Sequence, residues 1–404
     1  MKLRKQINRL GTIATFVVGT AGAGFAQTSS KPSPDAGFRA LAAKAAAARD
    51  AEHLDEAAAL YRKALRINPR WAEGWWTIGA IDYEADRYAE AALEFEKVVA
   101  LKPQHGTARA MLGFSQFRLG EDSEAMKNIG AAEAMGVADD DQLRRVMFYD
   151  EGVLLQRAGH FEAARSALGA LCQRGEADQD AMMALGMVAL WSTEAHPPTD
   201  AQAADVTMRV GRGACFGARK DFEAGRREFD IVAARAPRFP KFHLAYGRFL
   251  EDAGDSAGAI RQYKLEIDDN PGSILARFCI GAAEYKVDSA AGVPYAEEAV
   301  RLAPEQPYAH YLLGLLSLDT GEFSRAIAEL EVARKAFPNE ARIELALGSA
   351  YAHVGRTEDA ARARAEFQRL SQAQKTGAAD AAPPGLAGAP QLEIKEASES
   401  EGKP

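Results

Sequence analysis

Cysteine is scarce in this sequence, which has only three in 404 residues: Cys172, Cys215 and Cys279. They form no closely spaced pair, and no histidine lies beside such a pair, which argues against a zinc site. Each falls on a different predicted helix, with at least one other helix between any two of them. Helices once removed lie beyond the roughly 7 Å Cα separation that a disulfide spans. We therefore expect three buried free thiols, and neither a metal nor another cofactor.

An excess of positive charge is also missing, since 49 basic residues face 57 acidic ones. Four of the basic residues lie within residues 1–26, so the remainder has 45 basic and 57 acidic residues, a net charge of −12. Nucleic-acid binding requires a basic face for phosphate contacts, so we expect no nucleic-acid partner. The chain also lacks the Lys/Arg-rich amphipathic helix that is typical of proteins bound to a membrane surface.

Long apolar runs are absent except for one, from Leu10 to Phe25. Basic residues precede it, and small residues precede a plausible cleavage site after Ala26, which is typical of a secretory signal peptide. An uncleaved anchor helix is the alternative, but the run is short for a membrane span and contains several glycines. We expect an exported protein, periplasmic or secreted, with no membrane insertion after the signal is cleaved.

What the chain does contain is a helical hairpin pattern, clearest at residues 75–103. Gly79 follows a tryptophan and an isoleucine at helical spacing, and its missing side chain leaves room for a second helix to cross closely. Ala91 gives the same clearance from the second helix, and Phe95 fills the space between the two. Pro103 then ends the unit, because proline cannot continue a helix.

The pattern repeats along the chain in steps that are mostly 34 residues long. The small residue of the first helix recurs at Ala45, Gly79, Gly113, Gly152, Gly186, Gly213, Gly247, Gly281, Gly314 and Gly348. The small residue of the second helix recurs at Ala57, Ala91, Ala125, Ala164, Ala259, Ala326 and Ala360. The closing proline recurs at Pro69, Pro103, Pro237, Pro271, Pro304 and Pro338.

From about Asp35 to Leu370 the chain resembles a tetratricopeptide-repeat protein, of the exported bacterial type. The resemblance implies an all-α fold, a right-handed α-solenoid of about nine to ten helical hairpins. It also implies that the chain binds a protein or peptide partner, although it does not name that partner.

One interruption divides the predicted array. The step from Gly186 to Gly213 is only 27 residues, and a Pro197-Pro198 pair inside it cannot lie in a helix. Eleven extended residues, 192–202, reach roughly 36 Å, enough to run back along a helix and start the next one parallel to it. The predicted organisation is therefore a signal peptide at 1–26, a linker at 27–36, a repeat array at 37–191, a strap at 192–202, a second array at 203–372 and a disordered tail at 373–404.

A pentapeptide at 254–258, GDSAG, matches the G-x-S-x-G motif of serine hydrolases. That chemistry requires the serine on a strained turn after a strand, with a histidine and an acid in reach. Here the pentapeptide joins two predicted helices, and Gly254 occupies the turn position that other repeats also fill with glycine. We expect a helix turn and no enzyme activity, and a hydrolase is only a remote alternative. The acidic triplet 139–141 similarly predicts a helix N-cap rather than a calcium site.

In tetratricopeptide-repeat proteins the first helices of successive units line a concave groove. The matching positions give a candidate partner-binding set: Trp76, Tyr83, Phe114, Phe117, Arg118, Tyr149 and Arg157. We expect the aromatics to form one apolar stripe, with the two arginines near each other and able to bind a carboxylate. The alternative is that these aromatics only fill gaps between neighbouring first helices. The Asn and Lys of the family's carboxylate clamp are absent, since the matching positions hold Ala80, Ala110 and Phe114.

The sequence therefore favours an exported scaffold that holds a protein or peptide partner in its concave groove. A structural subunit of a multiprotein cell-envelope or secretion assembly is the alternative reading. In that case apolar residues should gather at the ends of the solenoid and not in the groove.

Overall fold

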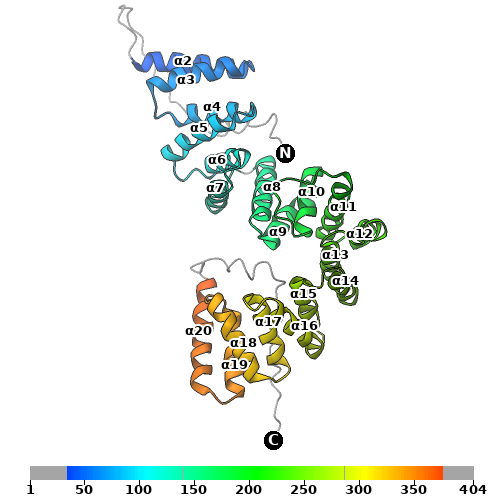
Figure 1. Ribbon diagram of the computed structural model, residues 1–404. Helices are drawn as coiled ribbons and strands as arrows, with labels where there is room; N and C mark the ends of the chain where they lie inside the picture. The colour runs from blue at the N-terminus through cyan, green and yellow to red at the C-terminus, as the bar shows by residue number, and fades with distance from the viewer. Residues whose placement is uncertain (1–33, 139, 286, 376–404) are drawn as a thin grey trace, which may run out of the picture. The chain divides into compact units, whose positions relative to one another are not determined.

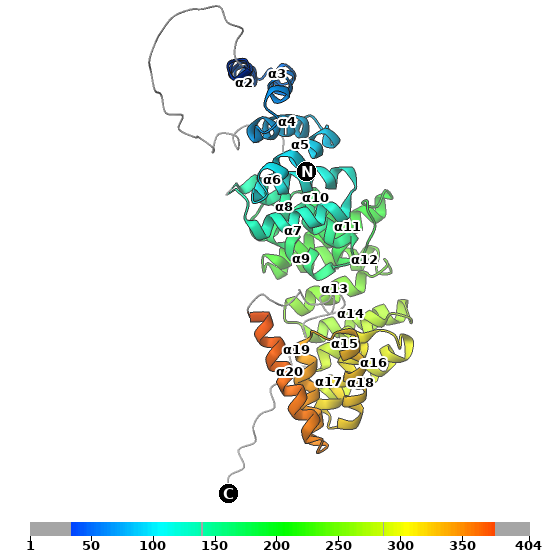
Figure 2. The same ribbon diagram turned by 90° about the vertical axis from the view of Figure 1, so that its left-hand side faces the viewer.

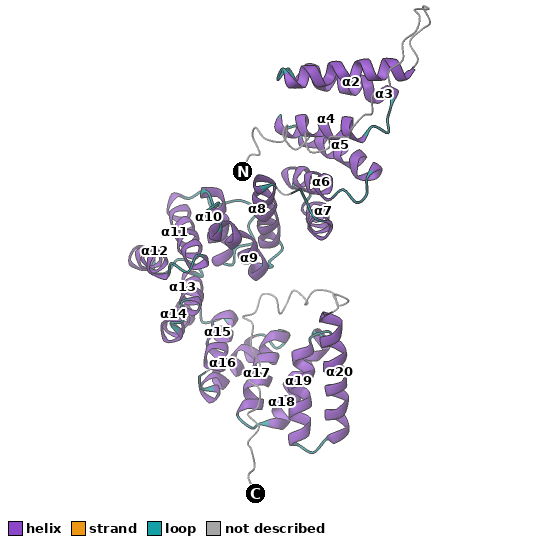
Figure 3. Ribbon diagram, turned by 180° about the vertical axis from the view of Figure 1, so that it is seen from behind, coloured by secondary structure: helices purple, strands orange, loops and turns teal. Residues whose placement is uncertain are grey.

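The computed structural model describes residues 34–138, 140–285 and 287–375, and in these ranges it contains nineteen α-helices and no β-strand (Figures 1 and 3). The predicted all-α repeat fold is confirmed. In chain order the helices are α2 (Pro34–Asp50), α3 (Leu54–Ile67), α4 (Ala72–Glu84), α5 (Tyr88–Leu101), α6 (Gly106–Leu119), α7 (Asp122–Met135), α8 (Asp141–Arg157), α9 (Phe161–Gln173), α10 (Gln179–Ala189), α11 (Ala201–Ala218), α12 (Phe222–Arg235), α13 (Phe242–Asp252), α14 (Ser256–Asp269), α15 (Ile274–Tyr285), α16 (Ser289–Leu302), α17 (Pro307–Asp319), α18 (Phe323–Ala336), α19 (Ala341–His353) and α20 (Thr357–Lys375).

The first and last helices extend slightly beyond the predicted arrays. Helix α2 includes residues 34–36 of the predicted linker, and α20 includes residues 373–375 of the predicted tail. The signal peptide at 1–26, and the tail beyond residue 375, lie outside the described residues. No helix in the described ranges is both long enough and apolar enough to cross a membrane.

The helices form hairpins because small residues let the two members of each pair approach closely. A methyl group built on Gly79 would lie 3.1 Å from the ring of Phe95 on the second helix of the same hairpin. At Gly247 the corresponding distance to the ring of Tyr263 is 2.3 Å, so any larger residue would push the helices apart. The alanines predicted on the second helices are buried, each at most 3 % exposed: Ala57, Ala91, Ala125, Ala164, Ala259, Ala326 and Ala360.

Within most hairpins the chain turns at a residue in the left-handed region. The five predicted turn glycines have φ between 75° and 82°: Gly120, Gly159, Gly254, Gly321 and Gly355. Glycine adopts this conformation without the steric cost that a Cβ imposes. Glu52, Asp86 and Lys220 have φ of 60°, 60° and 62° at the corresponding turns of other hairpins.

The GDSAG pentapeptide is such a turn. Gly254 ends the turn after α13, and Asp255 is the N-cap of α14, with its carboxylate accepting a hydrogen bond of 2.8 Å from the backbone N–H of Gly258. Ser256 is therefore the first residue of a helix, which is the role that the spacing predicts. In the same way Asp140 accepts from the backbone N–H of Leu143 at 2.8 Å, at the start of α8.

A second contact, found in two of the repeats, joins a repeat to the one before it. The indole N–H of Trp75 donates to the carbonyl of Pro69 at 2.8 Å. In the second to last hairpin, Nε2 of His310 on α17 makes the same contact with the carbonyl of Pro304, also at 2.8 Å. In these two repeats the large residue near the start of the first helix thus binds the proline that closes the preceding repeat.

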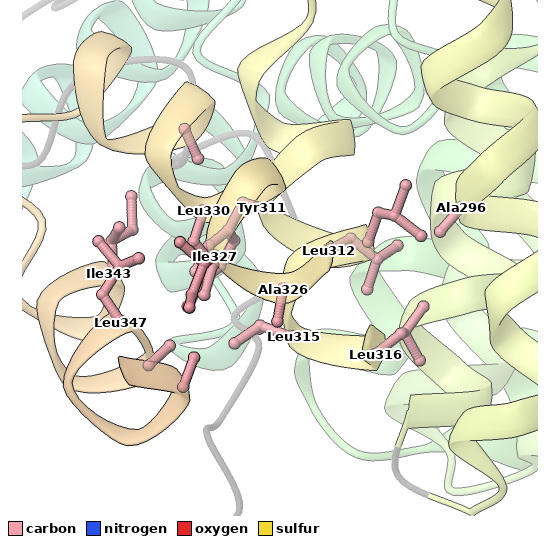
Figure 4. Close-up of a cluster of buried hydrophobic side chains, with 14 of the residues drawn as sticks. Ala296, Tyr311, Leu312, Leu315, Leu316, Ala326, Ile327, Leu330, Ile343 and Leu347 are labelled. Atoms are coloured by element: carbon pink, nitrogen blue, oxygen red, sulfur yellow. The ribbon is translucent and has the colours of Figure 1, made fainter. Parts of the chain in front are cut away.

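The core is built from the facing sides of neighbouring hairpins. Figure 4 shows this packing in the last repeats, where side chains from four successive helices meet. The labelled residues are Ala296 of α16, Tyr311, Leu312, Leu315 and Leu316 of α17, Ala326, Ile327 and Leu330 of α18, and Ile343 and Leu347 of α19. Helix α20 packs on α19 and ends the described part of the array (Figure 2).

The described chain forms two compact units, the first ending at Leu154 and the second beginning at Leu155. The division falls inside α8 and not at 192–202, where the sequence places the boundary between the two arrays. Contacts within the second unit explain the difference, because they hold together the helices on both sides of the strap.

The strap region itself has no helix between Ala189, the last residue of α10, and Ala201, the first of α11. Residues 201 and 202 of the predicted strap already belong to α11, because Asp200 caps this helix by accepting from the backbone N–H of Ala203 at 2.8 Å. Carbonyls of the strap and of the residue before it are bound by side chains from elsewhere in the second unit. Arg157 donates to the carbonyl of Ala195 at 3.1 Å, and Lys241 donates to the carbonyl of Trp191 at 2.7 Å.

Helix α11 runs antiparallel to α10, so the predicted parallel restart is wrong. A methyl group on Gly186 would lie 2.0 Å from the carbonyl oxygen of Thr207, and one on Gly211 would lie 1.8 Å from that of Met182. Residue numbers therefore rise along α10, from 182 to 186, where they fall along the facing part of α11, from 211 to 207. The backbones touch because both contact residues are glycines, which lack a side chain. Helix α11 thus takes the place of the second helix that the sequence of this repeat lacks.

The same helix also pairs with α12. A methyl group on Gly213 would lie 2.6 Å from the ring of Phe229, which is the contact expected of a first helix. Helix α11 therefore serves as the second helix of one hairpin and the first helix of the next (Figure 1). One helix with two roles accounts for the short step of 27 residues between Gly186 and Gly213.

Sharing α11 also corrects the prediction of three free thiols. Cys172 of α9 and Cys215 of α11 form a disulfide, with Cα atoms 5.3 Å apart, and only Cys279 is free. The prediction assumed that an intervening helix separates them. Helix α11 instead packs directly on α9 as well as on α10, which brings the two cysteines within bonding distance.

An ion-pair cluster further connects α9 with α13, across 86 or more residues of sequence. Arg165 donates to Asp252 at 2.7 Å, and Arg248 donates to Glu162 at 3.3 Å. Together with the disulfide, these contacts bind the helices before the strap to those after it. They are the physical reason why the second compact unit includes both.

Candidate functional site

The candidate site lies on the first helices of the first unit, α4, α6 and most of α8, and we refer to their shared surface as the first-helix face. A chain of polar contacts crosses these three helices. Arg118 of α6 donates to Oδ1 of Asp150 on α8 at 3.2 Å, and its charge also acts on the hydroxyl of Tyr83 on α4. Asp150 is completely buried and Tyr83 is 4 % exposed. Burial, with the nearby Asp150 carboxylate, raises the pKa of the Tyr83 hydroxyl well above its ordinary value.

These contacts change the role expected of Arg118. Its guanidinium already binds a carboxylate of the same chain, and it also lies 4.9 Å from the centre of the Phe117 ring. Such a buried, charge-assisted pair holds the side chain in one orientation. Arg118 therefore braces the first-helix face and is not available as the carboxylate-binding group that the sequence predicts.

Arg157, the second predicted arginine, lies in the second unit. It donates to the carbonyl of Ala195 and so helps to hold the strap. Its neighbour Gln156 does the same for the carbonyl of Glu194, at 3.2 Å. The structure thus gives each predicted arginine a partner inside the chain.

The predicted aromatics divide into two groups by exposure. Phe114 is completely buried, and Phe117 and Tyr83 are nearly so, at 8 % and 4 %. A side chain in such a position has no surface to offer a partner, so these three pack between helices, which is the alternative that the sequence left open. Trp76 and Tyr149 are half-buried and keep part of their rings at the surface.

Trp76 has well-defined neighbours. Its ring lies 5.5 Å from that of Phe95, edge to face, and 5.6 Å from the imidazole of His105. His105 is held in turn as the N-cap of α6, accepting from the backbone N–H of Ala108 at 3.1 Å. Burial, and then the positive charge of Lys102, lower the pKa of His105. Trp76 therefore packs against an imidazole and a phenyl ring while the residue stays half-buried, which suits an apolar anchor for a partner.

Sequence reasoning missed two buried acids that organise this unit. Asp150 completes the contact across α4, α6 and α8. Asp82 of α4 is also completely buried, binds Arg62 of α3, and accepts from Nε of Arg87 at 2.7 Å. An acid that follows an apolar stretch of a first helix is a signal that could have found Asp82, because burying a carboxylate requires a partner. Asp150 has no such signal, because Glu151 follows it in a helix rich in charge.

Asp82 belongs to a wider cluster with Glu94 of α5. Arg62 donates to Oε1 of Glu94 at 3.2 Å, so one guanidinium serves two acids on different helices. Burial, followed by the hydrogen bond that it shares with Asp82, raises the pKa of Glu94 to about 8. Glu151 of α8 has a pKa raised to about 7, by burial and then by repulsion from Glu133. Because the pKa values of Glu94 and Glu151 are raised, the stability of the first unit should depend on pH through these two acids.

The comparison with known families decides the classification. A model described as "Tetratricopeptide repeat" matches residues 42–106, 149–196, 216–274, 282–341 and 311–374, which together cover well over half of the chain. The chain belongs to the tetratricopeptide repeat family. Its helical scaffold is of the kind that mediates protein–protein interaction.

Solved structures of this family are similar to the chain at low identity. The crystal structure of MamA is 23 % identical and covers 41 % of this chain and 96 % of MamA, with a TM-score of 0.38. The APC/C hetero-tetramer Cut9–Hcn1 is 13 % identical over 83 % of this chain and 87 % of that one, with a TM-score of 0.36. Yeast Tom70 is 14 % identical over 83 % of this chain and 70 % of that one, with a TM-score of 0.33. No curated protein sequence matches significantly.

Proposed function

We propose that this protein is an exported, non-catalytic scaffold that holds a protein or peptide partner on the first-helix face of its first unit. The observation that carries the proposal is Trp76. Its indole packs against the rings of Phe95 and His105, and the residue is only half-buried. A rigid, half-exposed aromatic ring offers contact area at a low cost in side-chain entropy.

The face is also rigid enough to bind without reorganising. The Tyr83–Arg118–Asp150 contacts connect all three first helices, and Asp150 has no exposed surface. Because Arg118 and Asp150 bind each other inside the chain, we expect the contact offered by Trp76 and Tyr149 to be mainly apolar. We therefore propose that the partner presents an apolar side chain or short apolar segment.

Two observations support export. Basic residues followed by one apolar run make up residues 1–26, which is the pattern of a signal peptide. The Cys172–Cys215 disulfide is a bond that forms and persists in oxidising compartments and is rare in the cytosol. N-terminal sequencing of protein recovered from the cell envelope tests this part, and a product that still begins with Met1 would contradict it.

The binding proposal is tested with two matched variants of the first unit. After the partner is identified by crosslinking and mass spectrometry, its affinity is measured with purified components. Trp76→Ala should weaken binding by about 30-fold, the equivalent of ~2 kcal/mol for an anchor at an interface, with the fold retained. Phe114→Ala removes a completely buried ring and should cost about 3–5 kcal/mol of stability without changing the affinity of the folded fraction.

The two variants separate the alternatives clearly. If Trp76→Ala lowers stability in the same way as Phe114→Ala and leaves the affinity unchanged, the indole only packs. The first-helix face of the first unit would then lose its assignment as the binding surface. A partner whose affinity falls with Trp76→Ala alone would support it.

A further inference from the structure

A basic surface stands out on α11 and α12, in a chain whose net charge is −8. Residues 209–241 contain nine basic residues, seven of them arginine, and four acidic ones. This is a net charge of +5 in a short stretch, while the rest of the chain is acidic. The stretch covers most of α11, all of α12 and the residues leading to α13.

The acidic residues of this stretch are mostly engaged within the chain. Asp221 caps α12 by accepting from the backbone N–H of Ala224 at 3.2 Å. Glu228 accepts from Arg209 at 3.1 Å. Asp230 accepts from the hydroxyl of Tyr246 at 2.5 Å. Glu228 and Asp230 thus connect α12 to α11 and α13, and Asp221 caps α12, while Glu223 is exposed four residues before Arg227. Counting all four acids, the stretch keeps its net charge of +5.

Four basic side chains remain exposed without such a partner. Arg219, Lys220, Arg227 and Arg235 make no ion pair and no side-chain hydrogen bond within the described ranges of the chain. Arg227 and Arg235 are eight residues apart on α12, so they lie in one row with the half-buried Ile231 between them. Arg219 and Lys220 lie at the turn where α12 begins. We call these four residues the basic row.

Arginine is well suited to bind carboxylates. Its planar guanidinium can donate two parallel hydrogen bonds to one carboxylate, and it is enriched at protein interfaces, where lysine is depleted. Ile231 adds an apolar contact between the two guanidinium groups of the row. We propose that the basic row is a second interaction surface, which binds an acidic segment, rich in Asp and Glu, of a partner protein.

This inference goes beyond the proposed function, because the basic row lies on other helices and in the other unit. Its test uses a synthetic peptide and needs no knowledge of the partner that binds near Trp76. Failure of one proposal therefore leaves the other intact.

The experiment measures binding of a fluorescently labelled deca-glutamate peptide to the purified full-length protein by fluorescence anisotropy, at low and at physiological salt. The test variant is Arg227→Glu with Arg235→Glu. The matched control is Lys63→Glu with Arg66→Glu, which reverses two exposed basic residues on α3 of the first unit. Both double variants change the net charge by the same amount, and circular dichroism melting verifies that both are folded.

We expect the peptide to bind the unmodified protein, more weakly as salt rises, because exposed charges are screened. Binding by the Arg227→Glu, Arg235→Glu variant should fall about tenfold or more, whereas the α3 control should stay within about twofold. No binding at low salt, or an equal loss in both variants, would overturn the proposal. Tighter binding of phosphatidylglycerol vesicles or of single-stranded DNA, lost through the same two substitutions, would assign the row to another ligand and overturn it as well.

Discussion

Removing the Cys172–Cys215 disulfide gives the most direct test of how the second unit is held together. The bond closes a loop with a sequence separation of 43, and it joins α9 before the strap to α11 after it. Both half-cystines are buried. The double variant Cys172→Ala, Cys215→Ala replaces them with small apolar side chains, so it introduces no polar group into the core. The loss is then mainly that of the covalent constraint.

The magnitude follows from loop-closure entropy. For a loop of about 43 residues, the constraint on the unfolded chain is worth about 4 kcal/mol at 25 °C. With a urea dependence of about 3 kcal/mol per molar for the unit, the unfolding midpoint should fall by about 1.3 M. Hydrogen exchange should locate the effect, with faster exchange in α9 and α11 than in the last repeats, since each repeat contacts mainly its neighbours.

The assay is urea unfolding followed by circular dichroism, with and without a reducing agent. Reduction should lower the midpoint of the unmodified protein to that of the double variant and should leave the variant unchanged. Cys279→Ala is the control, because this buried thiol forms no disulfide. If the reduced and oxidised proteins unfold at the same urea concentration, the disulfide does not stabilise the fold and the reasoning fails.

Three further predictions concern single residues. Gly211→Ala should destabilise the second unit by about 3 kcal/mol or more in urea unfolding, because its methyl group would overlap a carbonyl of α10. The control Gly130→Ala on α7, where a methyl group would meet nothing within 4 Å, should instead stabilise the protein by about 0.5–1 kcal/mol. Glu52→Gly should raise stability by about 1 kcal/mol, because Glu52 has φ of 60° at a turn where other hairpins have glycine. Glu94→Gln should remove a pH dependence of the melting temperature. The pKa of Glu94 in the folded protein, about 8, exceeds the ordinary 4.5, so its contribution to folding stability is present at low pH and is lost as pH rises through 8.

Each of these has an outcome that would contradict it. Equal stability of the Gly211→Ala and Gly130→Ala variants would mean that α10 and α11 can move apart without cost. A loss of stability in Glu52→Gly would show that the left-handed turn carries no strain there. If the melting temperature of the Glu94→Gln variant still falls between pH 5 and 8 as much as that of the unmodified protein, other groups, such as Glu151, cause the pH dependence.

Much of the fold could be predicted because a repeat protein is encoded locally. Gly79, Ala91 and Phe95 lie within a single hairpin, and their spacing alone predicts how its two helices cross. The turn position of Gly254 could likewise be predicted, and with it the structural role of the GDSAG pentapeptide. These features depend on side chains that are close in sequence, so pattern and period were sufficient.

The candidate site was less predictable, because exposure depends on neighbouring helices. Trp76 and Phe114 both match groove positions of the family, yet one is half-buried and the other has no exposed surface. The two rings occupy different positions in the repeat: Trp76 lies three residues before Gly79, as Tyr149 does before Gly152, whereas Phe114 directly follows Gly113. Packing of the neighbouring helices decides which of these positions is covered. Arg118 is a similar case, because its partner Asp150 lies 32 residues further along, on another first helix.

The sequence by itself determined that the chain is an all-α array of hairpins, where most of them begin and end, and that the array is interrupted before Ala201. Only the tertiary structure decided that α11 serves two hairpins, that Cys172 bonds to Cys215, and that Arg165 and Asp252 meet across 87 residues. The physical reason is the range of the interactions. Hairpin formation depends on contacts between adjacent helices, which a period of about 34 residues records, whereas the direction of α11 depends on glycine faces that allow its backbone to touch α10.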